Sequence, residues 1–171
     1  IENEALILIA TQQPMAGDLR TIAAVLEITT ELERIGDYAK GIAKINLMIG
    51  ETPLIKPLID IPSMADKMQS MLHRALKAFV SRDVDLARVI PEEDEAIDAL
   101  YNQVYRELIA CIMTNSRNID QANFLLWVAH NLERAADRVI NICERVVFTV
   151  TGDMREMDTK ESEDLSVESI H

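Results

Sequence analysis

Two acidic residues one helical turn apart occur twice in this sequence, in the segments LERIGD at 32–37 and LERAAD at 132–137. The first copy pairs Glu33 with Asp37, and the second pairs Glu133 with Asp137. On a helix such like charges are neighbours, which costs roughly a few tenths of a kcal/mol unless something compensates. Hard divalent or trivalent cations bind several carboxylate oxygens and would supply that compensation. The repeated pairs are therefore candidate metal ligands.

A third acidic pair with the same spacing is formed by Asp94 and Asp98. If its helix packs antiparallel to the next one across a turn at 114–120, this pair comes opposite residues 133–137, because both lie about 20 residues from the turn. Four carboxylates would then converge on one site. The predicted metal ligands are Glu33, Asp37, Asp94, Asp98, Glu133 and Asp137. No catalytic or organic-cofactor residues are predicted.

The alternative interpretation is a charged, solvated helix face. Arg34 and Lys40 could neutralise the first pair, and Arg134 and Arg138 the second. With 29 acidic residues in 171, several such pairs are expected by chance, so one copy alone would carry no argument. The repetition and the third pair favour the metal.

Other conspicuous side chains are expected to have structural roles. His130 precedes Glu133 by three positions and could be a ligand, but Thr30 holds the equivalent place in the first copy. We therefore expect a hydrogen-bonded or exposed histidine. The side chains that we expect to serve packing are Trp127, Met64, Met68 and Met71.

The composition indicates an all-α protein. Hydrophobic residues make up 49% of the chain, whereas aromatic residues make up 4% and there are only five glycines and five prolines. The net charge of −12 disfavours binding to nucleic acid or anionic lipid. Cys111 and Cys143 lie in apolar helical segments and are expected to be reduced core residues of an intracellular protein. The apolar runs are too short to insert into a membrane, and no signal peptide is recognisable.

Helical periodicity and turn residues divide the chain into elements. The expected helices cover 1–12, 18–49, 62–81, 84–113 and 120–150. Pro91 should kink or split the fourth helix. We expect Asp18 to cap the second helix, and Ser81 or Asp83 to cap the fourth.

The repeat extends well beyond the two hexapeptides. At the same offset of 100, LIA at 8–10 matches LIA at 108–110, and Ile42 matches Ile142. We therefore divide the chain into a partial first repeat at 1–50, a linker at 51–62, a second repeat at 63–150 and an acidic disordered tail at 151–171.

The first repeat has no counterpart of residues 61–100, so we expect about 40 residues to precede residue 1 in the complete repeat. Without that helix, Leu26, Leu32 and Ile35 should be exposed. We therefore expect a homodimer, or a swapped pair, to cover them.

The segment QPMAGDLRTIAAVLEITTELERIGDYAKGIAKI resembles the signature hairpin of the PhoU family, and EDEAIDALYNQVYREL with NLERAADRVINI resembles the second repeat of that family. The resemblance covers residues 1–150. It implies tandem three-helix bundles, here without the first helix, and multinuclear clusters of iron, or of manganese, zinc or magnesium, bound through E/D-x-x-x-D motifs. It also implies a non-enzymatic, cytoplasmic protein that is peripheral to the inner face of the membrane through its partners.

The partners that the resemblance implies are the ATPase subunit of the phosphate transporter and a PhoR-type sensor histidine kinase. The chain would restrain high-affinity phosphate uptake and phosphate-starvation signalling by metal-dependent docking. Two alternatives stay open. A carboxylate di-iron oxidoreductase is disfavoured because E-x-x-H is absent from the repeated sites, and a metal-free helical adaptor would bear solvated acidic faces.

Overall fold

The computed structural model describes residues 1–153 and 157. This part of the chain is helical and contains no strand. The elements are α1 (Glu2–Gln12), α2 (Gly17–Ile49), α3 (Asp60–Ser81), α4 (Val84–Val89), the 3₁₀ helix η1 (Ile90–Glu93), α5 (Asp94–Thr114), the 3₁₀ helix η2 (Ser116–Asn118) and α6 (Ile119–Thr151). The all-α prediction is confirmed. The predicted acidic tail lies mainly outside the described residues.

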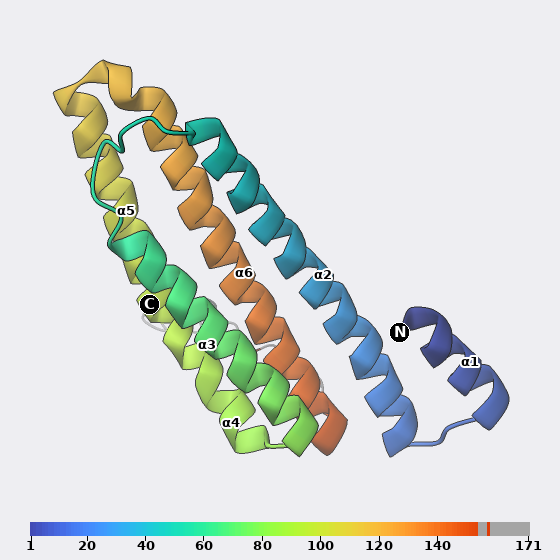
Figure 1. Ribbon diagram of the computed structural model, residues 1–171. Helices are drawn as coiled ribbons and strands as arrows, with labels where there is room; N and C mark the ends of the chain where they lie inside the picture. Colours follow the sequence, from blue (N-terminus) through green and yellow to red (C-terminus); the bar gives the residue numbers. More distant parts are fainter. Residues whose placement is uncertain (154–156, 158–171) are drawn as a thin grey trace, which may run out of the picture.

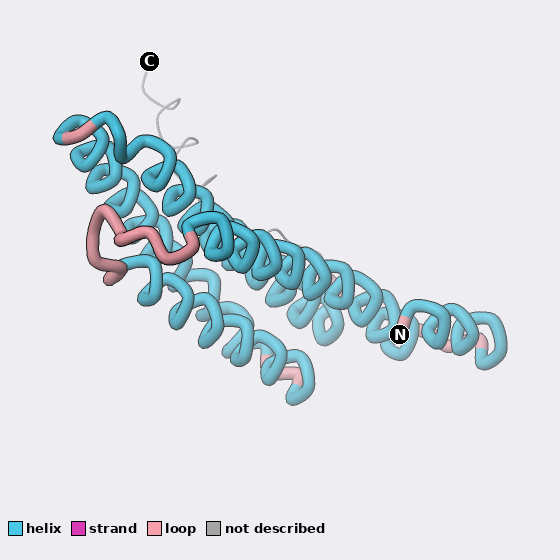
Figure 2. The backbone as a smooth tube through the Cα atoms, turned by 45° about the horizontal axis from the view of Figure 1, so that its top comes forward, coloured by secondary structure: helices cyan, strands magenta, loops and turns pink. Residues whose placement is uncertain are grey.

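The longest helices, α2 and α6, run antiparallel, as Figure 1 shows. Helix α6 packs against α2 and also against α3, α4 and α5, so it is the centre of the fold. The antiparallel orientation of α5 and α6 follows from the short turn at η2. Helix α1 forms a hairpin with the start of α2 and extends away from the other helices (Figure 2).

The core follows the apolar stripes that the sequence pattern predicts. Fully buried side chains line the inner faces of α3, α5 and α6, among them Met64, Met71, Ile97 and Ile142. Their spacing of three and four residues places them on one side of each helix. Ile28 and Ile35 of α2 join the same cluster. The core therefore spans both repeats and holds α2 against α6.

Pro91 divides the predicted fourth helix into α4, η1 and α5. A proline in a helix interior removes one backbone hydrogen bond and clashes with the preceding turn. The predicted break is confirmed. Asp83 is the N-cap of α4, because its Oδ1 accepts a hydrogen bond from the Leu86 N–H at 2.9 Å.

Two sequence predictions about single residues of α2 are wrong. Asp18 is not an N-cap: α2 begins one residue earlier, at Gly17, with Ala16 as its N-cap and no side-chain cap bond. Ile35 was expected to be exposed but is 8% exposed, because α2 packs on α6 along this face. The expected exposure is confirmed for Leu32, at 36%, whereas Leu26 is half-buried.

Trp127 is not a packing residue. It is 65% exposed, because the inward side of α6 at this level is occupied by Leu125, Val128 and Ala129. Met64 and Met71 are buried and Met68 packs against the core, so the prediction is confirmed for the three methionines.

Candidate functional site

The acidic pair on α5 begins immediately after η1. Asp94 is the first residue of α5 and is only 2% exposed, and Asp98 follows one turn later, half-buried. A carboxylate in the first turn is favoured by the free N–H groups and the dipole of its helix. The break at Pro91 therefore creates the helix start that accommodates the buried Asp94.

The antiparallel packing of α5 and α6 brings the second acidic pair to the same level. The Tyr101 ring of α5 lies 6.2 Å from the His130 ring of α6, centroid to centroid. Burial, followed by the negative charge of Glu133, raises the pKa of Tyr101. Asp98 lies one turn before Tyr101, and Asp137 one turn after Glu133. The segments of α5 and α6 that carry the two acidic pairs therefore lie opposite each other, as predicted.

The carboxylates on these helices already have partners. His130 Nδ1 lies 3.3 Å from Glu133 Oε2, and Asp94, Asp98 and Asp137 each make a polar or electrostatic contact of their own. His130 is accordingly a partly exposed, paired histidine, as we expected. Each of the four carboxylates therefore has an interaction within the protein.

The donor set fits a hard cation, because all four side chains supply carboxylate oxygens. The present arrangement does not gather them: within the described residues, no three His, Cys, Asp or Glu side chains are grouped so that they could hold one metal ion. Four side chains on facing helices would need to reorient to do so. The metal site at Asp94, Asp98, Glu133 and Asp137 stays a prediction.

The first pair has a different environment. Glu33 and Asp37 are both exposed on α2. Helix α1, which is equivalent by the repeat to the end of α5, contacts α2 only near the hairpin. A metal at the first pair also stays a prediction.

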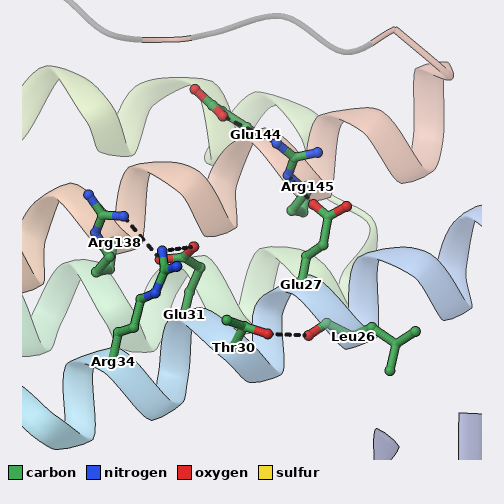
Figure 3. Close-up of polar contacts among 8 residues, drawn as sticks. All are labelled: Leu26, Glu27, Thr30, Glu31, Arg34, Arg138, Glu144 and Arg145. Atoms are coloured by element: carbon green, nitrogen blue, oxygen red, sulfur yellow. Dashed lines mark hydrogen bonds and ion pairs between the residues drawn. The ribbon is translucent and has the colours of Figure 1, made fainter.

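The contact between α2 and α6 contains a ladder of ion pairs that the sequence pattern did not reveal (Figure 3). Arg145 Nε lies 2.8 Å from Glu27 Oε2. Further along, Glu31 serves two arginines: Arg34 Nη1 donates a hydrogen bond to it at 3.2 Å, and Arg138 Nη1 lies 3.6 Å away. The side chains of Glu31 and Arg138 are 12% and 23% exposed, so these two charges are largely withdrawn from water, whereas that of Arg34 is 52% exposed.

The sequence feature that could have indicated these ion pairs is the spacing of their residues on α2. Glu27, Glu31 and Arg34 follow one another at four and three residues, on a stripe of α2 that continues into Tyr38 and Ile45. Sequence reasoning assigned Arg34 and Arg138 to the repeated acidic pairs, because those are their nearest acidic neighbours along the chain. The sequence does not indicate that Glu31 lies between the two arginines.

The same contact continues as an apolar and aromatic seam. The Arg134 guanidinium lies over the Tyr38 ring, 5.3 Å from its centroid. A cavity of about 290 Å³ opens beside this pair, between α2, α3 and α6, and its lining includes Ile35, Met68 and Leu132. Its walls are mostly apolar, and Tyr38 and Gln69 are the polar side chains among them.

The Cys143 thiol is unsuited to metal binding or nucleophilic chemistry. Cys143 is fully buried, and burial raises the pKa of its thiol to about 12. Cys111 is half-buried and, like Cys143, forms no disulfide. The prediction of a core residue is confirmed for Cys143.

Long paired helices, a charged seam between two related halves and acidic pairs on the helix surfaces define a helical-bundle protein. A model of the PhoU domain matches residues 1–45 and 61–146, that is, both halves of the repeat. The chain belongs to the PhoU family, which is a non-enzymatic family of accessory and regulatory proteins.

Curated relatives support the assignment over most of the chain. The phosphate-specific transport system accessory protein PhoU homolog of Clostridium acetobutylicum is 38% identical over 156 residues, which covers 89% of this chain and 70% of the relative. The homolog of Deinococcus radiodurans is 34% identical over 152 residues, covering 89% and 71%.

Solved structures share the fold. The crystal structure of the phosphate transport system regulatory protein PhoU from Streptococcus pneumoniae matches with a TM-score of 0.82 and 33% identity, covering 90% of this chain and 72% of that one. PhoU from Pseudomonas aeruginosa matches with a TM-score of 0.81 and 32% identity. None of the helices in the described part of this chain combines the length and apolar character that crossing a bilayer requires.

Proposed function

We propose that this protein is a negative regulator of high-affinity phosphate uptake and of phosphate-starvation signalling. It acts by docking on the ATPase subunit of the phosphate transporter and on a PhoR-type sensor kinase, at the inner face of the cell membrane. The observation that carries the proposal is the family match over both halves of the repeat, together with relatives named as accessory proteins of phosphate-specific transport.

The structure agrees with action by docking. The described residues form a helical bundle in which ion pairs, such as those of Glu31 with Arg34 and Arg138, support the contact between α2 and α6. With a net charge of −12, the protein as a whole favours basic surfaces and disfavours anionic ones.

A metal is the second part of the proposal. The candidate ligands on α5 and α6 are Asp94, Asp98, Glu133 and Asp137, and those on α2 are Glu33 and Asp37. A bound cation would cross-link α5 to α6 through these carboxylates and thereby stiffen the docking surface. Iron is the first candidate, followed by manganese, zinc or magnesium. A metal-free adaptor is the alternative, and elemental analysis after gentle purification separates the two.

A deletion of the gene tests the regulatory function. We expect phosphate-starvation genes to be expressed in phosphate-rich medium, and a plasmid copy of the full gene to repress them again. Immobilised protein should retain the purified ATPase subunit or the sensor kinase with an affinity that falls as salt is added. If starvation genes stay repressed in the deletion strain and neither partner is retained, the proposal is wrong.

A further inference from the structure

Trp127 is the single tryptophan of the chain, and it lies 65% exposed on α6, within a well-packed part of the bundle. Tryptophan presents a large apolar surface, and it is enriched among the residues that dominate the energy of protein interfaces. Its exposure costs hydrophobic free energy in the isolated protein. No role in the core accounts for it.

On one side, Trp127 adjoins an exposed apolar strip of α5. The Tyr101 and His130 rings mark the level at which α5 and α6 face each other. One turn further along the antiparallel helices, the same geometry brings Tyr105 to the level of Trp127. Tyr105 is 46% exposed, and Ile109, the next residue on that stripe, is 39% exposed.

On its other side, Trp127 adjoins the end of α2. The register of the seam is set by Arg134 over Tyr38 and by Asn131, whose Nδ2 would lie 3.4 Å from a Cβ placed on Gly41. One further turn of both helices brings Ile45 to the level of Trp127. Met48, one turn beyond Lys44 on α2, is 64% exposed. We call Met48, Tyr105, Ile109 and Trp127 the tryptophan face.

The charge around the tryptophan face is opposite in sign to that of the whole protein. Residues 38–50 and 101–134, which contain this face, hold five Lys and Arg residues and three acidic ones. The basic residues are Lys40, Lys44, Arg106, Arg117 and Arg134, and all are exposed. Of the acidic residues, Asp120 is exposed near the start of α6, Glu107 pairs with Lys56 and Glu133 contacts His130.

We propose that the tryptophan face is the surface that docks on the transporter ATPase subunit, and that it recognises an acidic patch around an apolar pocket that receives Trp127. This inference rests on the proposed function and specifies its contact. A central aromatic residue with basic side chains at its rim has the arrangement of an interface hot spot. The complementary partner surface is therefore acidic, although the protein as a whole would favour a basic one.

Two other binding partners match the tryptophan face less well. A second copy would set the same basic face against itself in a two-fold interface, so that like charges would meet. An anionic membrane would be repelled by the net charge of −12.

The test measures the dissociation constant of the full chain with the purified ATPase subunit by calorimetry. We expect Trp127→Ala to bind roughly thirty-fold more weakly. Val80→Ala, which removes an 84% exposed apolar side chain from α3, should bind like the wild type. Helicity and melting temperature should be unchanged in both variants, because both side chains are exposed. If Trp127→Ala binds as tightly as the wild type, the tryptophan face is not the docking surface, but the proposed function stands. If the wild type itself binds no ATPase subunit, the proposed contact with that subunit is wrong as well.

A second experiment tests the sign of the charge around the tryptophan face. Lys44→Glu combined with Arg106→Glu should weaken binding at least about tenfold. Lys67→Glu combined with Lys77→Glu makes the same charge change on exposed positions of α3 and should not weaken it. Stronger binding by the first double variant would contradict an acidic partner surface.

Because Trp127 is the single tryptophan, its 5-fluoro derivative provides one fluorine NMR signal on the docking face. We expect this signal to shift on addition of the ATPase subunit. It should not shift with vesicles of phosphatidylserine and phosphatidylcholine, nor with rising concentration of the protein alone. A shift with vesicles, or a dimer that Trp127→Ala dissociates, would replace the proposed partner by a membrane or by a second copy.

Discussion

Charged groups of one chemical type have different environments in this protein. Asp94 is buried at the start of α5, Glu133 contacts His130, and Glu33 lies exposed on α2. Burial of a carboxylate is tolerated where a helix start or a neighbouring cation compensates it. The same residue type can therefore serve stability at one position and remain available for a ligand at another.

Glu133→Gln combined with Asp137→Asn should abolish metal binding at the α5–α6 junction. Two of its four oxygen-donating groups would lose their charge, while relief of the like-charge repulsion should leave the fold intact or slightly more stable. Metal content by elemental analysis and helicity by circular dichroism check the two effects. Glu92→Gln combined with Glu95→Gln, on exposed positions nearby, is the matched control. Equal metal content in both variants would refute the site.

The Cys143 thiol should make the protein less stable at alkaline pH. Burial raises its pKa from the ordinary value of 9.0 to about 12. Above pH 9 the unfolded chain therefore loses this proton while the folded protein keeps it, which favours unfolding by up to about 1.4 kcal/mol per pH unit until pH 12. Below pH 9 the effect is absent. Denaturant unfolding from pH 8 to 10.5 should show a shallower decline for Cys143→Ala than for the wild type or Cys111→Ala.

At the scale of the element, helix boundaries follow from single residues. Pro91 separates α4 from α5, and Asp83 starts α4 with a side-chain cap. The left-handed conformation of Arg82, with φ of 54°, ends α3 and allows the chain to reverse at once. These three residues position the start of α5, and with it Asp94, against α6.

Asp83→Ala should lower the free energy of unfolding by about 1 kcal/mol, because the Leu86 N–H would lose its hydrogen-bond acceptor. Ser81 was the competing candidate for this cap. Its hydroxyl donates to the Lys77 carbonyl instead, so Ser81→Ala should change stability by less than about 0.5 kcal/mol. Urea unfolding of the two variants checks the difference, and equal effects would contradict the assignment of the cap.

At the scale of the molecule, the contact of α2 with α6 joins the two repeats. Its ion pairs differ in exposure: the side chain of Glu31 is 12% exposed, whereas that of Glu27 is 49% exposed. Partly buried charges stabilise an interface only while each has its partner. The Glu31 ion pairs therefore contribute more to the orientation of the repeats than the more exposed pair does.

Glu31→Gln should destabilise the protein by about 1–3 kcal/mol, because Arg34 and Arg138 would lose the charge between them. Glu27→Gln should cost less than about 1 kcal/mol, since its pair with Arg145 is more exposed. Thermal unfolding at low and high salt measures both. A larger loss for Glu27→Gln would mean that the ladder does not hold the repeats together.

The homodimer was predicted because Leu26, Leu32 and Ile35 were expected to be exposed, but Ile35 is buried against α6. A larger set of exposed apolar side chains lies at the α1–α2 hairpin. Leu6, Ile7, Leu8 and Leu19 are each more than 40% exposed. Covering them would be favourable, so light scattering should show a dimer, and Leu6→Glu combined with Leu19→Glu should yield monomers. Val80→Glu on α3 is the control. A wild-type monomer at micromolar concentration would contradict the prediction.

The sequence by itself determined the helical class, the helix limits to within two residues, the break at Pro91 and the repeat, because these depend on periodicity and on local backbone chemistry. It also predicted that the acidic pairs of α5 and α6 lie at one level, since a short turn leaves two helices little choice but antiparallel packing.

Only the tertiary structure decided which side of α6 is left uncovered and which distant charges meet. Leu125 and Trp127 are two positions apart and both apolar, yet one is 2% and the other 65% exposed. Glu31 pairs with Arg138, more than a hundred residues away, through the rotation of α2 about its axis. That rotation is set by the sum of many core contacts, among them those of Ile28 and Ile35, and no local pattern encodes the sum.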